Sequence, residues 1–314
     1  MFSKTYKYPT KHNARRCLML KGNILSQNDI EQFIELGWVK VPQAFDRKAA
    51  LKAQDYLWEQ VETRGIKRLD QTTWAEPMLR INENYDTEDF RACNSERLSD
   101  AIEDLVGKGR WIGRGKVNHW GWWPVNFSDG ANREWDVPTN GWHWDGIHFK
   151  HHVNSPEQGL LCLCIFSDIG PKGGGTLVAE GSHKVVAQYL ANQPNGVELK
   201  DGIEAVNKGH EWFSKLTGHE EIGQASNNKK NRIEYFMNQT VKTDGVSLRV
   251  VETTAEAGDV FLCHPFLYHA SSQNHSGIPR FMCNRTTPLG EKLQLTRTNA
   301  CEYSPLEISI RDAL

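Results

Sequence analysis

The sequence has 314 residues, enough for one large domain or two small ones. Its formal net charge of −2, from 37 basic and 39 acidic side chains, gives no reason to expect a nucleic acid or a membrane as a partner. The longest apolar runs, such as 159–166, are far shorter than the roughly 20 residues that cross a bilayer.

The seven cysteines form an odd set without a CxxC pair, which favours reduced thiols and an intracellular, cytoplasmic location. Cys162 and Cys164 alternate in an apolar segment and are expected to pack in the core. No apolar signal-peptide segment opens the sequence. Residues 1–16 carry basic side chains and no acid, so we expect residues 1–25 to be a solvated N-terminal arm. Organellar targeting by this arm is the alternative.

Three helices are predicted in the first third of the chain, each with a capping side chain before it and a glycine after it. Their predicted starts and ends are Ser26 and Gly37, Asp46 and Gly65, and Ser95 and Gly107. A short strand is expected to begin at Trp38, directly after the first helix.

From Trp111 the pattern changes to short β segments that Gly, Pro and Asn interrupt. The predicted strands are 111–119, 121–127, 141–149, 159–168, 174–180, 247–254, 259–264, 267–272 and 279–287. Residues 182–245 interrupt them and are expected to form a helical insertion or lid. Helices followed by many short strands predict an α+β fold with a β-sandwich or barrel at its centre, in one domain over 1–314.

The segment from Gly141 to Gly146 places His143 and Asp145 two residues apart on a predicted strand. Side chains at this spacing point to the same face of a strand. His269 lies in a second β-rich segment and is a candidate third ligand. Two histidines and one carboxylate on one face of a metal form the facial triad of non-haem Fe(II) oxygenases.

Arg280 follows His269 by eleven residues, at the start of the next predicted strand. A guanidinium there could bind a dicarboxylate through two parallel hydrogen bonds, which lysine would do less well. Ser271 shares the strand face of His269 and could donate to the same carboxylate.

In this order, the motifs resemble the phytanoyl-CoA dioxygenase (PhyH-like) family of Fe(II)/2-oxoglutarate oxygenases, to which ectoine hydroxylase is also related. The matching parts cover roughly 26–290 and are 30–39, 142–146, Asp168 with 173–184, and 258–280. The resemblance implies a double-stranded β-helix, a cupin-like jelly roll. N-terminal helices would pack on one sheet, and a helical insertion would lie between strands.

The resemblance also implies roles for individual residues. The catalytic Fe(II) ligands would be His143, Asp145 and His269, and 2-oxoglutarate would be bound by Arg280, Ser271 and Asn126, with Asn118 in reserve for the last. The implied cofactors are Fe(II), 2-oxoglutarate and O₂, with ascorbate as a reductant in vitro. An intact Asp145 favours oxygenation, because related halogenases carry a small residue at that position.

Other histidines and the tryptophans offer alternatives. His264 could replace His269 as a ligand, and His183 is expected to be structural. Two alternatives remain for His148, His151 and His152: they lie at the surface or rim of the site, or they contact the substrate. Five tryptophans should lie mainly in the core, with one or two of them lining the pocket. They are Trp120, Trp122, Trp123, Trp142 and Trp144.

The predicted function is oxidation of an unactivated C–H bond in a small-molecule metabolite, with release of succinate and CO₂. The outcome could be hydroxylation, or oxidative cyclisation or desaturation in secondary metabolism. A non-catalytic jelly-roll binding protein and a hydroxylase of macromolecules are the alternatives. The sequence leaves the substrate and the oligomeric state open.

Overall fold

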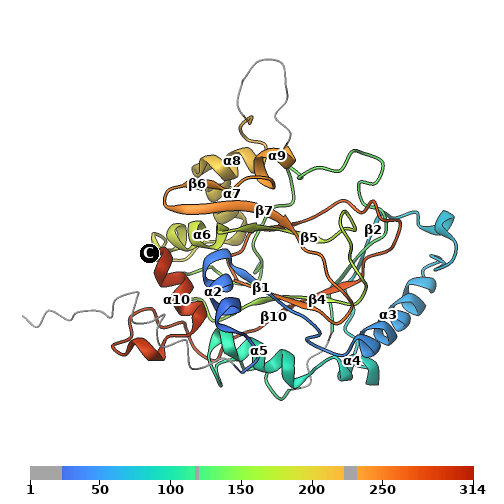
Figure 1. Cartoon of the computed structure of the whole chain (residues 1–314), viewed down its shortest axis with the longest axis horizontal. Coiled ribbons are helices and arrows are strands. Elements are labelled where there is room, and N and C mark those ends of the chain that lie inside the picture. Colours follow the sequence, from blue (N-terminus) through green and yellow to red (C-terminus); the bar gives the residue numbers. More distant parts are fainter. Residues whose placement is uncertain (1–22, 117–119, 223–231) are drawn as a thin grey trace, which may run out of the picture.

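The computed structural model describes residues 23–116, 120–222 and 232–314 (Figure 1). Its helices are α2 (Gln27–Leu36), α3 (Arg47–Glu62), α4 (Glu88–Ala92), α5 (Glu96–Val106), α6 (Ser182–Ala191), α7 (Leu199–Gly209), α8 (Glu211–Leu216), α9 (Arg232–Phe236) and α10 (Pro305–Ala313), with 3-10 turns at Gln71–Thr73 and Ala300–Glu302. Its strands are β1 (Trp38–Val41), β2 (Met78–Ile81), β3 (Trp123–Asn126), β4 (Leu161–Ile165), β5 (Thr176–Glu180), β6 (Val241–Thr243), β7 (Val246–Glu252), β8 (Val260–Cys263), β9 (His269–Ser271) and β10 (Met282–Thr286).

The capping signals place the first three long helices correctly. Ser26 caps α2 in a capping box with Asp29, and Gly37 ends that helix in the left-handed region, at φ 88°. The side chains of Asp46 and Ser95 accept backbone hydrogen bonds at the starts of α3 and α5. These three helix predictions are confirmed, because each cap satisfies backbone groups that the helix itself leaves unpaired.

Two four-stranded antiparallel sheets form the centre of the structure. Their strand orders are β1-β8-β4-β10 and β6-β7-β5-β9, and β2 and β3 form a separate antiparallel pair. The chain therefore has the predicted mixture of helices and antiparallel sheets.

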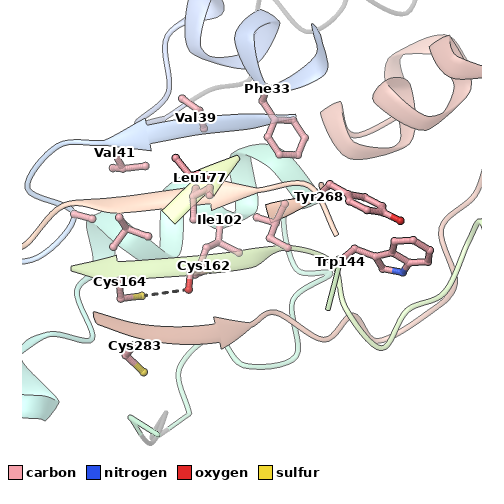
Figure 2. Close-up of a cluster of buried hydrophobic side chains, with 14 of the residues drawn as sticks. Phe33, Val39, Val41, Ile102, Trp144, Cys162, Cys164, Leu177, Tyr268 and Cys283 are labelled. Atoms are coloured by element: carbon pink, nitrogen blue, oxygen red, sulfur yellow. Dashed lines mark hydrogen bonds between the residues drawn. The ribbon is translucent and has the colours of Figure 1, made fainter. Parts of the chain in front are cut away.

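The two faces of β4 show how the layers pack. Leu161, Leu163 and Ile165 belong to a buried cluster shared with Val178 of the second sheet. Cys162 and the other residues at even positions face a cluster that includes side chains of α2, α3 and α5. Figure 2 shows part of that cluster. The first sheet is thus covered by helices on one face and by the second sheet on the other.

Two predicted strands do not form as expected. Residues 141–149 contain a single β-bridge, because Gly141 and Gly146 adopt positive φ angles of 79° and 121° and interrupt the extended backbone on both sides. Residues 111–116 form a bridge and turns, and 117–119 lie outside the described residues. Three observed elements, β2, α4 and α10, were not predicted.

The segment 182–245 is largely helical, as predicted. Its described part contains α6 to α9 and ends in β6, which pairs with β7 at the edge of the second sheet. The four helices gather beside that sheet (Figure 1). The short strand β6 was not expected there.

The cysteines match the expectation in part. Cys162 and Cys164 are buried free thiols, as are three more: Cys93, Cys263 and Cys283. Cys301, however, is in a disulfide, which corrects the prediction that all the thiols are reduced. The N-terminal arm lies largely outside the described residues. Among the helices that the structure describes, none has the length and apolar character of a membrane span.

Candidate metal centre

Three side chains that are far apart in the sequence meet at one point. Ligand atoms of His143, Asp145 and His269 all lie within 4.8 Å of one another. The Nε2 atom of His143 is 3.4 Å from one carboxylate oxygen of Asp145, and that of His269 is 3.8 Å from the other. Two ligands of one metal ion, each about 2.1 Å from it, are separated by about 3 Å, so these spacings suit a common ion.

The backbone holds the two histidines opposite each other. His143 and His269 form an antiparallel bridge in which each backbone N–H donates to the carbonyl of the other residue, at N···O distances of 3.1 and 2.9 Å. His269 begins β9, which pairs with β5 inside the second sheet. The residues around His143 therefore extend that sheet at its β9 edge.

Each imidazole has one nitrogen engaged by the backbone and the other directed to the cluster. The Nδ1 atoms contact the carbonyl oxygens of Gly141, at 2.7 Å from His143, and of Leu267, at 3.1 Å from His269. Such a contact fixes the tautomer with a proton on Nδ1, which leaves the Nε2 lone pair for a metal. The Nε2 atom of His269 is buried and has no hydrogen-bond partner among the described residues.

The charges of the three groups influence one another. Burial alone would lower the pKa of His143, but the hydrogen bond and charge of Asp145 raise it overall. Burial opposes ionisation of Asp145, yet the hydrogen bond from His143 and the two imidazoles hold its pKa below the usual value. Burial, assisted by His143, lowers the pKa of His269 to about 4. His269 is therefore neutral at pH 7, as a metal ligand must be.

Arg280 is almost fully buried and forms no ion pair with any residue that the structure describes. Its backbone pairs with Asn126 in a β-bridge just before β10, and its side chain is 2% exposed. Its Nε and Nη1 atoms have no hydrogen-bond partner among the described residues. Burial lowers the pKa of this guanidinium to about 10, with Asp129 opposing the shift. A buried unpaired cation is costly, so this geometry suits a ligand that brings a carboxylate.

The triad, Arg280 and Ser271 line one cavity of about 490 Å³. This volume is in the range of small-molecule sites. Residues in and next to β2, β3 and β10 also line the cavity, among them Arg80, Asn82, Trp122 and Asn284. None of the described residues of 182–245 lines this cavity. The predicted lid role of that segment therefore stays a proposal without structural support.

The geometry argues against the predicted role of Asn126. Its side-chain nitrogen donates to the carbonyl of Ser272 at 3.0 Å, and its side-chain oxygen accepts from the backbone of Asp129 at 3.0 Å. Both polar atoms are therefore used inside the protein, and the residue does not line the cavity. The reserve candidate, Asn118, lies outside the described residues.

The remaining histidines lie apart from the triad, except one. His264 is buried beside His183, and its Nδ1 accepts from the backbone of Phe266 at 3.1 Å. His151 bonds Gly146 and the indole of Trp144. Of the five other histidines considered above, which include His152, His148 alone lines the cavity. Of the five tryptophans considered above, Trp122 alone lines the cavity and the other four are buried.

The sequence analysis missed Arg80, Asn82 and Asn284. The first two alternate with the buried Leu79 and Ile81, which is the pattern of a half-buried strand. Asn284 stands four residues after Arg280, on the same face of an extended segment. Both signals were present in the sequence.

The residues fit a ferrous ion with 2-oxoglutarate. Two neutral imidazoles and a carboxylate are the donor set of facial Fe(II) sites. The orphaned Nε2 of His269 and the unpaired guanidinium of Arg280 are the positions where a metal and a dicarboxylate would remove unsatisfied buried groups.

The family model "Phytanoyl-CoA dioxygenase (PhyH)" matches residues 86–282. No curated protein matches the chain. Similar solved structures include HygX from Streptomyces hygroscopicus with nickel and 2-oxoglutarate bound, at 12% identity and a TM-score of 0.42 over 83% of this chain and 85% of that one. The epimerase SnoN from nogalamycin biosynthesis has 15% identity and a TM-score of 0.44, over 82% of this chain and 80% of that one. EctD from S. alaskensis, with 2-oxoglutarate and 5-hydroxyectoine, has 16% identity and a TM-score of 0.43. The match covers 83% of this chain and 74% of that one.

The family match spans more than half of the chain, and it includes both His143 and Asp145 of the triad as well as His269 and Arg280. The assignment depends on this match together with the site geometry. The chain belongs to the phytanoyl-CoA dioxygenase family and is a non-haem Fe(II)/2-oxoglutarate-dependent oxygenase.

Proposed function

We propose that the protein oxidises an unactivated C–H bond of a small-molecule metabolite. The observation that carries this proposal is the placement of the triad and of an unpaired, buried Arg280 in one cavity of about 490 Å³. A cavity of this size suits a metabolite and the cosubstrate together better than a segment of a macromolecule.

In this proposal, His143, Asp145 and His269 would hold the iron at the cavity that they line. Arg280 binds the distal carboxylate of 2-oxoglutarate, and Ser271 donates to the same group. When bound, the iron and its cosubstrate supply the oxidising power of O₂ for C–H cleavage. For hydroxylation, one oxygen atom enters the alcohol and the other enters succinate, while the cosubstrate loses CO₂.

Groups of the protein itself orient the metal ligands and the substrate. The backbone carbonyls of Gly141 and Leu267 keep both imidazole rings in the ligating tautomer. The choice between hydroxylation, cyclisation and desaturation depends on how the cavity wall places the substrate, because that choice is sensitive to ångström-scale position.

We also propose that the two facing sheets form a double-stranded β-helix within one catalytic domain. The shared buried cluster between β4 and β8 on one side and β5 on the other supports this. The bridge between His143 and His269 would then place the metal at the open end of the sandwich.

The test is turnover of 2-oxoglutarate. Purified protein with Fe(II), ascorbate, O₂ and a metabolite mixture should form succinate, and His143→Ala should form none. The control is His275→Ala, a substitution of an exposed histidine that does not line the cavity. Full succinate formation by His143→Ala would overturn the proposed metal site.

A further inference from the structure

The part of the cavity wall that comes from β2, β3 and their neighbours has its own chemical character. It is built by the antiparallel pair of β2 and β3, in which Arg80 stands opposite Pro124. Asn82 and Trp122 continue this wall next to that pair. We infer that this wall binds the substrate, and that the substrate is a small carboxylic acid with an apolar body. This inference deepens the proposed function and depends on it.

Arg80 is the first observation. It lines the cavity, it is exposed, and it has no ion pair or hydrogen bond among the described residues. The nearest acid in the sequence, Glu83, is already engaged, because it pairs with Arg64 at 2.6 Å and accepts from the hydroxyl of Tyr85 at 2.8 Å. The guanidinium of Arg80 is therefore available to an anion that enters the cavity.

The balance of charge in the loaded site is the second observation. Asp145 is the sole acidic residue among the described residues that line the cavity, and the cationic ones are Arg80 and Arg280. The positive charges of Fe(II) and Arg280 are balanced by Asp145 and by the two carboxylates of 2-oxoglutarate. Arg80 is then left with one uncompensated positive charge. A substrate with a single carboxylate neutralises it, whereas an ammonium group would meet no free anion in this cavity.

Two exposed apolar side chains of the cavity, Trp122 and Ile147, are available to the apolar body of the substrate. Trp122 is 41% exposed and lies at a positive φ of 63°, a backbone conformation that bulky residues rarely adopt and that is enriched at ligand sites. Ile147 is 62% exposed at the same cavity. An exposed indole, an exposed aliphatic side chain and an arginine that line one cavity suit a ligand that joins an apolar body to an anionic group.

Asn284 adds a polar requirement. Its side-chain oxygen is buried and has no hydrogen-bond partner among the described residues. A hydroxyl or N–H group of the substrate could donate to it, which would satisfy a buried acceptor. The wall thus combines a cation, an apolar surface and an acceptor.

The experiment compares matched acids and amides. The protein is loaded with Ni(II) and 2-oxoglutarate, so that no turnover occurs, and calorimetry measures binding of 3-phenylpropionate against 3-phenylpropionamide and of indole-3-acetate against indole-3-acetamide. We expect each acid to bind at least about tenfold more tightly than its amide, as loss of a hydrogen bond to a charged group predicts. Arg80→Gln should remove this preference, whereas Arg91→Gln, at an exposed arginine outside the cavity, should keep it.

Three results would overturn the inference. The first is that the acids bind no better than the amides, and the second is that Arg80→Gln keeps the preference for acids. The third is that Arg80→Gln weakens 2-oxoglutarate binding tenfold or more, which would place Arg80 at the cosubstrate.

A separate experiment measures binding of 2-phenylethyl phosphate. Tighter binding of this dianion than of phenylpropionate would contradict the inference that the substrate carries a single carboxylate. Failure of the Ni(II)-loaded wild-type protein to bind 2-oxoglutarate is distinct, because it overturns the proposed function as well.

Discussion

His143 and His269 exchange both of their backbone hydrogen bonds across an antiparallel bridge, and their ring centroids are 4.4 Å apart. The two residues are separated by most of the second half of the chain, so the bridge brings together the two parts of the triad. Since the pairing uses backbone atoms, the alignment of the histidines does not depend on their own side-chain interactions. The backbone pairing therefore places the two histidines of the triad next to each other.

Asp145→Asn should abolish tight binding of Fe(II). The substitution keeps the shape of the side chain and removes the charge that faces both Nε2 atoms at 3.4 and 3.8 Å. Metal analysis after anaerobic reconstitution should find about one iron per wild-type chain and little in the variant. Fe(II) should also raise the Tm of the wild-type protein and not that of Asp145→Asn, because a ligand that binds the native state stabilises it. Equal iron content in the two proteins would contradict the ligand assignment.

Arg280→Met should separate binding from stability. Loss of a buried charge pair with 2-oxoglutarate should cost about 2–5 kcal/mol of binding free energy, which raises the KM for 2-oxoglutarate at least about 30-fold. Without the cosubstrate, the free energy of unfolding should fall little or even rise, because the variant removes an unpaired buried cation and fills similar space. Succinate assays and urea unfolding test the two parts. An unchanged KM would refute the role of Arg280.

Gly37→Ala should destabilise the fold by about 2–4 kcal/mol, which combines backbone strain with overpacking. Gly37 has a φ of +88°, and a Cβ atom there would lie 2.5 Å from Nδ1 of His183 and 2.9 Å from a methyl carbon of Leu267. Gly65→Ala is a matched control, because Gly65 has a φ of +84° and no heavy atom within 4 Å of the added Cβ. It should cost only about 1–2 kcal/mol. Equal losses in urea unfolding would show that the contact with His183 contributes nothing.

Acid should destabilise the metal-free protein through His183. This side chain is buried against the carbonyl of Ile34, and burial, together with the charge of Lys184, lowers its pKa to about 3. The unfolded chain takes up this proton near pH 6.5, so between pH 6.5 and 3 the unfolded state binds more protons than the native state. The free energy of unfolding should then fall by about 1.4 kcal/mol for each pH unit from this residue. The neighbouring His264, whose pKa burial also lowers, acts in the same direction.

Urea unfolding in the presence of a chelator, at several pH values between 7 and 4, measures this slope. His183→Gln should have a shallower dependence on pH than the wild-type protein, because it removes one of the buried imidazoles whose pKa is lowered. His275→Ala, at an exposed histidine, should keep the wild-type slope. An identical slope in His183→Gln would exclude a contribution from His183.

Much of the fold could be predicted because its signals are local. The caps at Ser26, Asp46 and Ser95 determine where the helices begin through contacts within three residues. The apolar segment of β4 is buried on both faces, and it is recognisable as a strand without knowledge of its neighbours. The strand predicted at 141–149 failed, because glycines with positive φ interrupt it and the bridge at His143 depends on a partner far along the chain.

By itself, the sequence determined the chemical identity of the site: an HxD pair, a later histidine and an arginine in the order of a known family. It also determined where α2, α3 and α5 begin, since capping acts over a few residues. Only the tertiary structure decided which groups share the cavity. Packing used both polar atoms of Asn126 inside the protein. It placed His264 away from the metal site and brought Arg80 into the cavity that the triad lines. These outcomes depend on sheet pairing between distant segments, and no pattern within a short stretch of sequence specifies that pairing.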